Sequence, residues 1–227
     1  MGEMKYYYPM NLDISKFNCL IVGLGKVGQR KLATLIQFHP KTITILDPIA
    51  SLPDKFKTYS FINFQQKHFE PEDLQDKELI FACTSNPKLN SFIAHLALKH
   101  KLLVNNITEP KEGNFILPAV LKKQDIQISI SSSGLSPALV KYLKKEINEL
   151  IGPEYEVCTK ILGTIRPLLL NLKLPVEKRS EMFNNLVSSL IPLLRKKDVG
   201  AIKTLLTRAL PKELSPYIGE ILNECLF

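Results

Sequence analysis

Hydrophobic positions in the first hundred residues fall into short continuous runs that alternate with stretches of helical spacing. The runs lie at residues 18–23, 42–46, 61–64, 78–83 and 102–106, and each predicts a strand. Between them, apolar positions on one face predict a helix over 27–38, and a second helix is predicted over 87–99 with Asn86 as its cap. Strands that alternate with helices indicate a parallel sheet with right-handed crossovers.

The pattern changes after Pro110. Two apolar runs, 115–121 and 126–131, are separated by a short polar stretch and predict a β-hairpin. In the second run Ile126, Ile128 and Ile130 alternate with polar residues, so one face of the hairpin is apolar. A two-stranded hairpin is too small to be stable alone. It therefore needs a partner surface, and another subunit is a natural candidate.

The remainder of the chain is predicted to be helical. A helix opens at Ser136-Pro137 by capping logic and ends at Gly152-Pro153. No strand pattern follows, and helices are predicted over 177–195, 198–210 and 216–226. We therefore predict an α/β fold with a Rossmann-like parallel sheet in residues 1–113, a hairpin-plus-helix region in 114–152 and an all-helical C-terminal domain in 153–227.

A glycine-rich loop follows the first predicted strand and opens the first predicted helix. It reads Gly23-Leu24-Gly25-Lys26-Val27-Gly28. In the dinucleotide-binding fingerprint the first glycine allows a tight turn, the second lets the backbone approach a pyrophosphate, and the third lets helix and strand pack closely. The helix N-terminus then presents free N–H groups to the phosphates. The alternative is a glycine-rich turn in a Rossmann fold that has lost its cofactor.

Other predicted cofactor contacts come from the ends of later strands. Asp47, followed by Pro48, stands where a carboxylate meets the ribose hydroxyls, and its charge would repel a 2′-phosphate. This favours NAD over NADP. Thr84 follows the predicted strand at 78–83, and Asn106 ends the predicted strand at 102–106. Both therefore lie at the edge of an open α/β sheet where ligands bind.

Composition narrows the class of partner. The formal net charge is +8, but the basic residues are scattered and aromatic residues are not interleaved with them, which argues against nucleic acid and favours a polyanionic small molecule. No apolar run reaches the roughly 18 residues of a membrane span, and the first residues lack the apolar core of a signal peptide, so we expect a cytoplasmic protein without a membrane partner.

The cysteines and histidines predict no metal site. The four cysteines form no CxxC pair and are expected to be buried free thiols. The histidines have no metal-ligand spacing.

Several separated motifs resemble the siroheme-synthase N-terminal family over roughly residues 5–150. They are Tyr8-Pro9-Met10-Asn11-Leu12, the glycine loop with Gln29-Arg30-Lys31, the segment from Asn105 to Lys111, Asn114-Phe115-Ile116-Leu117-Pro118, and Ile130 to Pro137. The resemblance implies a precorrin-2 dehydrogenase, in some members also a sirohydrochlorin ferrochelatase. It also implies a homodimer, with the hairpin and the following helix as the dimerisation region. The implied substrate is a polycarboxylate tetrapyrrole, which suits a basic protein.

The resemblance places two residues at the catalytic centre, and one of them departs from the family pattern. Thr108 stands where the family has an aspartate implicated in catalysis and metal insertion, while Glu109 is adjacent. Threonine is a poor general base and a poor iron ligand, so metal insertion is more in doubt than hydride transfer, which depends on positioning. Ser132 matches a serine that the family places beside the active site.

Three functions remain open on these grounds. The first is an NAD-dependent precorrin-2 dehydrogenase. The second is a bifunctional dehydrogenase and ferrochelatase in which another acid replaces the aspartate. The third is a nucleotide-sensing Rossmann module without catalysis.

Overall fold

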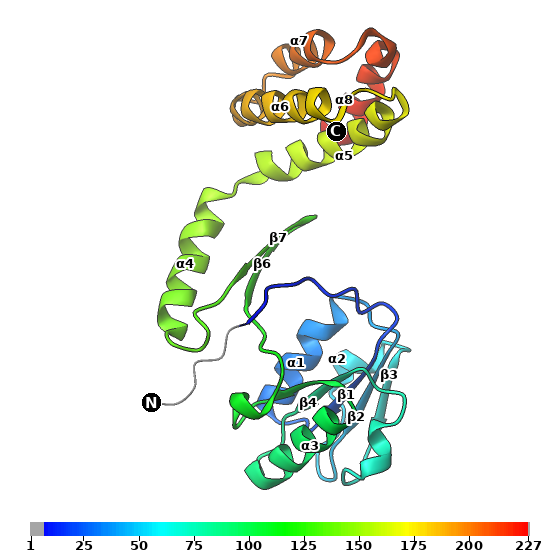
Figure 1. Ribbon diagram of the computed structural model, residues 1–227, viewed down its shortest axis with the longest axis vertical. Helices are drawn as coiled ribbons and strands as arrows, with labels where there is room; N and C mark the ends of the chain where they lie inside the picture. The colour runs from blue at the N-terminus through cyan, green and yellow to red at the C-terminus, as the bar shows by residue number, and fades with distance from the viewer. Residues whose placement is uncertain (1–6, 227) are drawn as a thin grey trace. The chain divides into compact units, whose positions relative to one another are not determined.

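The computed structural model describes residues 7–226 and contains a parallel sheet near the N-terminus (Figure 1). The strands of this sheet within the described residues are β1 (Asn18–Val22), β2 (Thr42–Leu46), β3 (Ile62–Gln65), β4 (Leu79–Ala82) and β5 (Leu103–Asn106). Their order is β3-β2-β1-β4-β5, and all neighbouring pairs are parallel. The predicted α/β fold is confirmed, with each strand within a residue or two of its predicted bounds.

The register brings the carboxyl ends of the strands to one edge. Val22 pairs with both Leu46 and Ala82, and Ala82 pairs with Asn106. The chain turns away from the sheet beyond these residues, so the segments after β1, β2, β4 and β5 all leave from the same edge. The strand order reverses between β1 and β4, which is where an open α/β sheet forms its ligand crevice.

Helices cover both faces of the sheet (Figure 1). Helix α1 (Lys26–Ile36) packs Leu32, Leu35 and Ile36 on one face, and α3 (Pro87–Lys99) packs Ile93, Ala94 and Ala97 on the other. The strands are buried on both sides, which explains why they are continuous apolar runs and not alternating ones. The short helix α2 (Asp54–Lys57) and the 3₁₀ turns η1 (Pro71–Leu74) and η2 (Pro110–Glu112) complete this part.

The segment around Asn114 closes the outer edge of β5. The backbone N–H of Asn114 donates to Val104 O, and its side chain accepts from Val104 N and donates to Leu102 O. Phe115 then packs edge-on against the buried ring of Phe81. The predicted strand over 115–121 was therefore wrong at its start, because Phe115 belongs to the core beside the parallel sheet.

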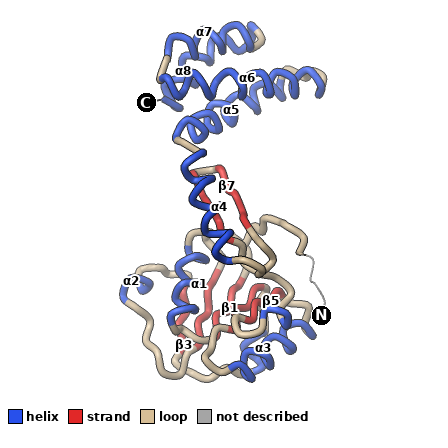
Figure 2. Tube along the Cα trace, turned by 90° about the vertical axis from the view of Figure 1, so that its left-hand side faces the viewer, coloured by secondary structure: helices blue, strands red, loops and turns tan. Residues whose placement is uncertain are grey.

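The β-hairpin begins four residues later than predicted. Its strands are β6 (Ala119–Lys123) and β7 (Ile126–Ile130), joined by Gln124 and Asp125. Helix α4 (Pro137–Leu150) runs along the hairpin and contacts both strands (Figure 2). None of the residues of α4 is buried, and the hairpin buries only Leu121.

The C-terminal part is a helical unit with its own apolar core. It contains α5 (Pro153–Asn171), α6 (Val176–Lys196), α7 (Val199–Ala209), η3 (Lys212–Tyr217) and α8 (Ile218–Leu226). Three of these correspond to predicted helices, whereas α5 was missed, since Gly163 and Pro167 interrupt its pattern. Cys158, Ile161, Ile165 and Leu169 are nonetheless buried at helical spacing.

The chain divides into two compact units, Met1–Leu117 and Pro118–Phe227. The first holds the parallel sheet, and the second holds the hairpin and the helices that follow it. Among the described residues, no helix combines the length and the apolar character needed to cross a membrane.

Candidate functional site

The three glycines of the loop after β1 have different structural environments. Gly23 has a φ of +95°, and a Cβ there would lie 2.7 Å from Cys83 O, so it needs glycine for both conformation and space. A Cβ on Gly28 would overlap Gly23 O. By contrast, a Cβ on Gly25 would meet no atom of residues 7–226 within 4 Å. The fold therefore requires glycine at 23 and 28, while it leaves open space beside Gly25.

The open space beside Gly25 coincides with the N-terminus of α1. Gly25 is the N-cap of this helix, and no side chain caps it. The first N–H groups of a helix have no partner inside the helix. Uncapped N–H groups, a helix dipole and a glycine with open space above it together fit a bound pyrophosphate. Lys26 and Val27, which form the first turn, are exposed and partly buried respectively.

The side chain of Asp47 holds the glycine loop and its own turn. Its Oδ2 accepts a hydrogen bond from Leu24 N at 2.7 Å, and its Oδ1 accepts from the N–H groups of Ile49 and Ala50 at 2.9 and 2.8 Å. Pro48 lies exposed within this turn.

Asp47 stays ionised. Partial burial acts to raise the pKa of its carboxyl group, but the backbone N–H groups outweigh this effect, and the pKa is held below its usual value. The carboxylate thus places a negative charge beside the glycine loop.

The loop after β4 is organised by Asn90, a fully buried residue of α3. Its Oδ1 accepts from Thr84 N at 3.0 Å and from Thr84 Oγ1 at 2.7 Å, while its Nδ2 donates to Thr84 O at 3.0 Å. Asn86 caps α3 by accepting from Lys88 N and Leu89 N, so its predicted capping role is confirmed. Ser85 is exposed.

The loop after β5 is organised by Asn106, which is also fully buried. Its Oδ1 accepts from Thr108 N, Thr108 Oγ1 and Glu109 N at 3.0, 2.8 and 3.2 Å. Its Nδ2 donates to Glu112 Oε2 at 2.9 Å. The side chain of Asn106 therefore shapes the loop that presents Thr108.

Asn90 joins these two loops. Its Nδ2 lies 3.3 Å from Thr108 Oγ1, so one amide contacts both Thr84 and Thr108. Sequence reasoning missed this residue. The available signal was a polar side chain at position 90 on the stripe that continues through Ile93, Ala94 and Ala97, where a buried amide needs partners.

Ser132 belongs to the second unit. Its Oγ accepts from Ser136 N at 2.9 Å, and Ser136 Oγ in turn accepts from Leu139 N at the start of α4. Within that unit the serine run therefore forms the turn that leads into the helix.

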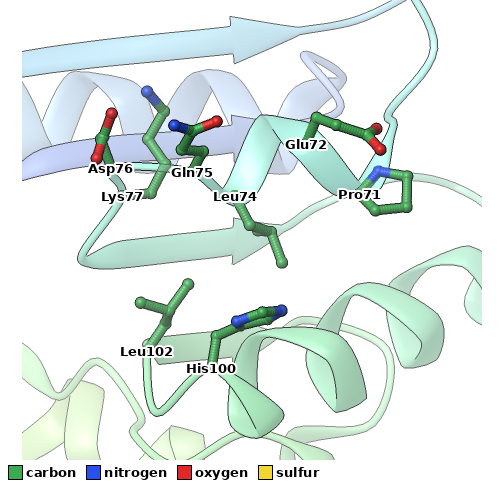
Figure 3. A pocket seen from close by; sticks show the side chains of 8 residues that line it. All are labelled: Pro71, Glu72, Leu74, Gln75, Asp76, Lys77, His100 and Leu102. Atoms are coloured by element: carbon green, nitrogen blue, oxygen red, sulfur yellow. The ribbon is translucent and has the colours of Figure 1, made fainter.

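A pocket of about 460 Å³ lies at the opposite edge of the sheet, before β4 and β5 (Figure 3). Leu74, Lys77, His100 and Leu102 are among its lining residues. It is remote from the carboxyl ends of the strands and holds none of the predicted site residues.

The cysteines are buried free thiols, as predicted. Burial raises the pKa of Cys19 and of Cys83 to about 12, which keeps both thiols protonated. Among the described residues, no group of three or more histidine, cysteine or acidic side chains is placed to hold a metal ion.

Two family models match adjacent parts of the chain. Residues 10–119 match a model described as putative NAD(P)-binding, and residues 123–150 match one described as sirohaem biosynthesis protein central. Together these matches cover more than half of the sequence.

Similar proteins are siroheme synthases. That of Pseudoalteromonas atlantica is 32% identical over 146 residues, covering 64% of this chain and 31% of the relative. That of Nitrosomonas eutropha is 33% identical over 66% of this chain and 32% of the relative. That of Blochmanniella pennsylvanica is 28% identical over 96% of this chain and 43% of the relative. The chain thus spans about a third to two fifths of the length of these relatives.

A solved structure shares the fold. The protein described as SirC, precorrin-2 dehydrogenase, superposes with a TM-score of 0.73 at 22% identity, over 89% of this chain and 98% of that chain. This likeness extends beyond the parallel sheet into the second unit.

Proposed function

Because the chain belongs to the siroheme-synthase N-terminal family, we propose that it is an NAD-dependent precorrin-2 dehydrogenase that forms sirohydrochlorin. In this reaction precorrin-2 loses a hydride and a proton, and the products are sirohydrochlorin, NADH and H⁺. When bound, NAD⁺ would supply the hydride acceptor.

The observation that carries the proposal is the asymmetry of the glycine loop. Packing explains glycine at 23 and 28, but no contact among the described residues requires it at 25. A ligand that lies close to the backbone of Gly25 would explain why glycine stands there. The uncapped N-terminus of α1 favours a ligand that is an anion. The Rossmann module is thus built to hold a dinucleotide.

The residues of the chain act mainly by positioning. The glycine loop would hold the pyrophosphate, Asp47 fixes the loop and would bind the ribose, and the loops after β4 and β5 would present Thr84 and Thr108 at the reacting end. Hydride transfer depends on holding two carbons in the right geometry, so positioning of this kind is a sufficient role for these residues.

We propose NAD as the cofactor in preference to NADP. The ionised Asp47 lies beside the loop, and a carboxylate there attracts ribose hydroxyls but repels a 2′-phosphate.

We also propose that the active protein is a homodimer joined through residues 114–152, with the helical domain beginning at 153. The apolar side chains of Leu139, Tyr142 and Leu150 on α4 are 50%, 59% and 64% exposed. Helix α4 contacts the hairpin but buries no residue of its own, so these exposed apolar side chains are left uncovered by the described residues. Light scattering coupled to gel filtration tests this, and a monomer at micromolar concentration would contradict it.

The proposed reaction is tested by mixing the purified protein with precorrin-2 and either NAD⁺ or NADP⁺. We expect NADH absorbance and the sirohydrochlorin spectrum to rise together, with NAD⁺ the better cofactor. Tight binding of NAD⁺ without turnover would instead support a nucleotide-sensing module.

A further inference from the structure

We propose that Thr108 offers its ligand a hydrogen-bond acceptor and no proton, and that Asn90 and Asn106 are positioning residues that impose this polarity. The inference rests on the proposed function for the identity of the ligand. The ligand group that Thr108 would bind is therefore an N–H donor. Both the nicotinamide carboxamide and a pyrrole of the tetrapyrrole have such a group.

The orientation of the Asn90 amide is set by the backbone of Thr84. One end of the amide faces Thr84 N, which can only donate, and the other end faces Thr84 O, which can only accept. Oδ1 and Nδ2 of Asn90 therefore cannot be exchanged. Since Thr108 Oγ1 faces Nδ2, the hydroxyl of Thr108 must accept this hydrogen bond.

The orientation of the Asn106 amide is set in the same way. Its Oδ1 faces the N–H groups of Thr108 and Glu109, which can only donate. Its Nδ2 faces a carboxylate oxygen of Glu112. Since Thr108 Oγ1 lies 2.8 Å from Oδ1, the hydroxyl of Thr108 must donate its proton to Asn106.

These two constraints use up most of the capacity of the Thr108 hydroxyl. A hydroxyl has one proton and two lone pairs. The proton is committed to Asn106 and one lone pair to Asn90, so a single lone pair remains. Thr108 is exposed, whereas both amides are completely buried, so the remaining lone pair is the accessible part of the network.

This polarity has a chemical consequence for the site. A hydroxyl whose proton is held by a buried amide does not act as a general acid, and a neutral threonine is no general base. It can orient an N–H group on the ligand. The fully paired network also gives a reason for two buried asparagines here, Asn90 on α3 and Asn106 at the end of β5.

The test compares Thr108→Val, which removes the hydroxyl, with Thr108→Ser, which keeps it. We expect Thr108→Val to weaken binding of one of two ligands, NAD⁺ or sirohydrochlorin, by roughly 2- to 12-fold, the value of one neutral hydrogen bond. Loss of NAD⁺ affinity identifies the carboxamide as donor, and loss of sirohydrochlorin affinity identifies a pyrrole. Thr108→Ser should restore binding.

A matched control is Thr58→Val, an exposed threonine at the end of α2. It should change neither affinity. If Thr108→Val also leaves both affinities unchanged, the proposal is overturned.

The pH profile separates an acceptor from a base. If Thr108 only accepts, the midpoints of kcat/KM against pH in Thr108→Val match those of the unmodified protein, at a lower plateau. Disappearance of a limb of the profile would overturn the proposal, because it would show that Thr108 carries a titrating role.

Asn90→Asp tests the positioning role, since it replaces the donor that faces Thr108 with an acceptor of the same shape. We expect it to weaken binding of the same ligand that Thr108→Val affects. The double variant Asn90→Asp/Thr108→Val should bind that ligand no more weakly than the weaker-binding of the two single variants. Additive effects would show that Asn90 does not act through Thr108. Thermal unfolding of each variant controls for loss of fold.

These measurements stay informative if the proposed function fails. An unmodified protein that does not oxidise precorrin-2 overturns the dehydrogenase, while the two binding assays still test whether Thr108 contacts a ligand.

Discussion

Oδ2 of Asp47 accepts a hydrogen bond from the backbone N–H of Leu24 at 2.7 Å. The acid after β2 thus holds the middle of the glycine loop after β1. This contact makes the loop and the acid a single structural unit, so a change at Asp47 affects both the shape of the proposed phosphate site and its charge.

Asp47→Asn should lower both stability and cofactor affinity. An amide has only one acceptor oxygen, so either Leu24 or the pair Ile49 and Ala50 loses its partner. Loss of a hydrogen bond to a charged group predicts about 1.5–3 kcal/mol less free energy of unfolding, measured in urea. Asp54→Asn is a matched control, because Asp54 is exposed and forms a surface ion pair with Lys57, and it should change neither property. Equal stability of Asp47→Asn and the unmodified protein would contradict the role in the loop.

Stability should fall in acid partly through Asp47. Its pKa is lowered in the folded protein, so the stabilisation by the carboxylate is complete above the unfolded pKa of about 3.9 and is lost as pH falls through the folded value. The difference in unfolding free energy between the unmodified protein and Asp47→Asn should therefore shrink below about pH 4. A difference that grew on acidification would have the wrong sign for this linkage.

Gly25→Asp should abolish NAD⁺ binding without weakening the fold. The position has open space and an ordinary φ of −66°, and aspartate is a favourable N-cap, so the melting temperature should stay the same or rise. The added carboxylate would nevertheless occupy the approach of the pyrophosphate and repel it. Isothermal titration and thermal unfolding measure the two effects.

Gly28→Ala is the contrasting variant. Its Cβ would overlap Gly23 O, so this variant should lower the free energy of unfolding through a clash inside the fold and not through a ligand contact. If both variants lost stability equally, the distinction between the glycines would be refuted.

The thiols of Cys19 and Cys83 should be unreactive in the native protein. Both are buried with a pKa of about 12, so a thiol reagent at pH 8 finds almost no accessible thiolate. After unfolding in guanidinium chloride, all four cysteines of the sequence should react. Rapid labelling of Cys83 before unfolding would show that the carboxyl end of β4 opens.

The protein should insert Fe²⁺ or Co²⁺ into sirohydrochlorin no faster than the reaction without protein. Thr108 keeps its proton and takes none from the pyrroles, because Asn106 holds it as a donor. Thr108→Asp should leave dehydrogenation largely intact and should raise the rate of metal insertion, since a carboxylate can accept protons. An unchanged rate in that variant would show that more than this one group is missing.

The spacing of apolar residues along the sequence was sufficient to predict the parallel sheet, because its strands are buried on both faces and are continuous apolar runs. The same spacing did not predict the place of Phe115 or the helix α5. The apolar run at 115 continues into β6, and only packing against Phe81 assigns its first residues to the other unit. In α5 a glycine and a proline weaken the helical pattern, and burial of Ile161, Ile165 and Leu169 offsets that weakness.

By itself the sequence determined the Rossmann module, its glycine loop and Asp47, since these depend on residue type and spacing along one βαβ unit. The tertiary structure alone decided which glycine is open to a ligand and which are required by packing, because that depends on Cys83 O and Gly23 O reaching the loop. It also decided the polarity of Thr108. Asn90 lies on α3 and Asn106 ends β5, and only the packing of α3 beside β5 brings their amides to the two sides of one hydroxyl.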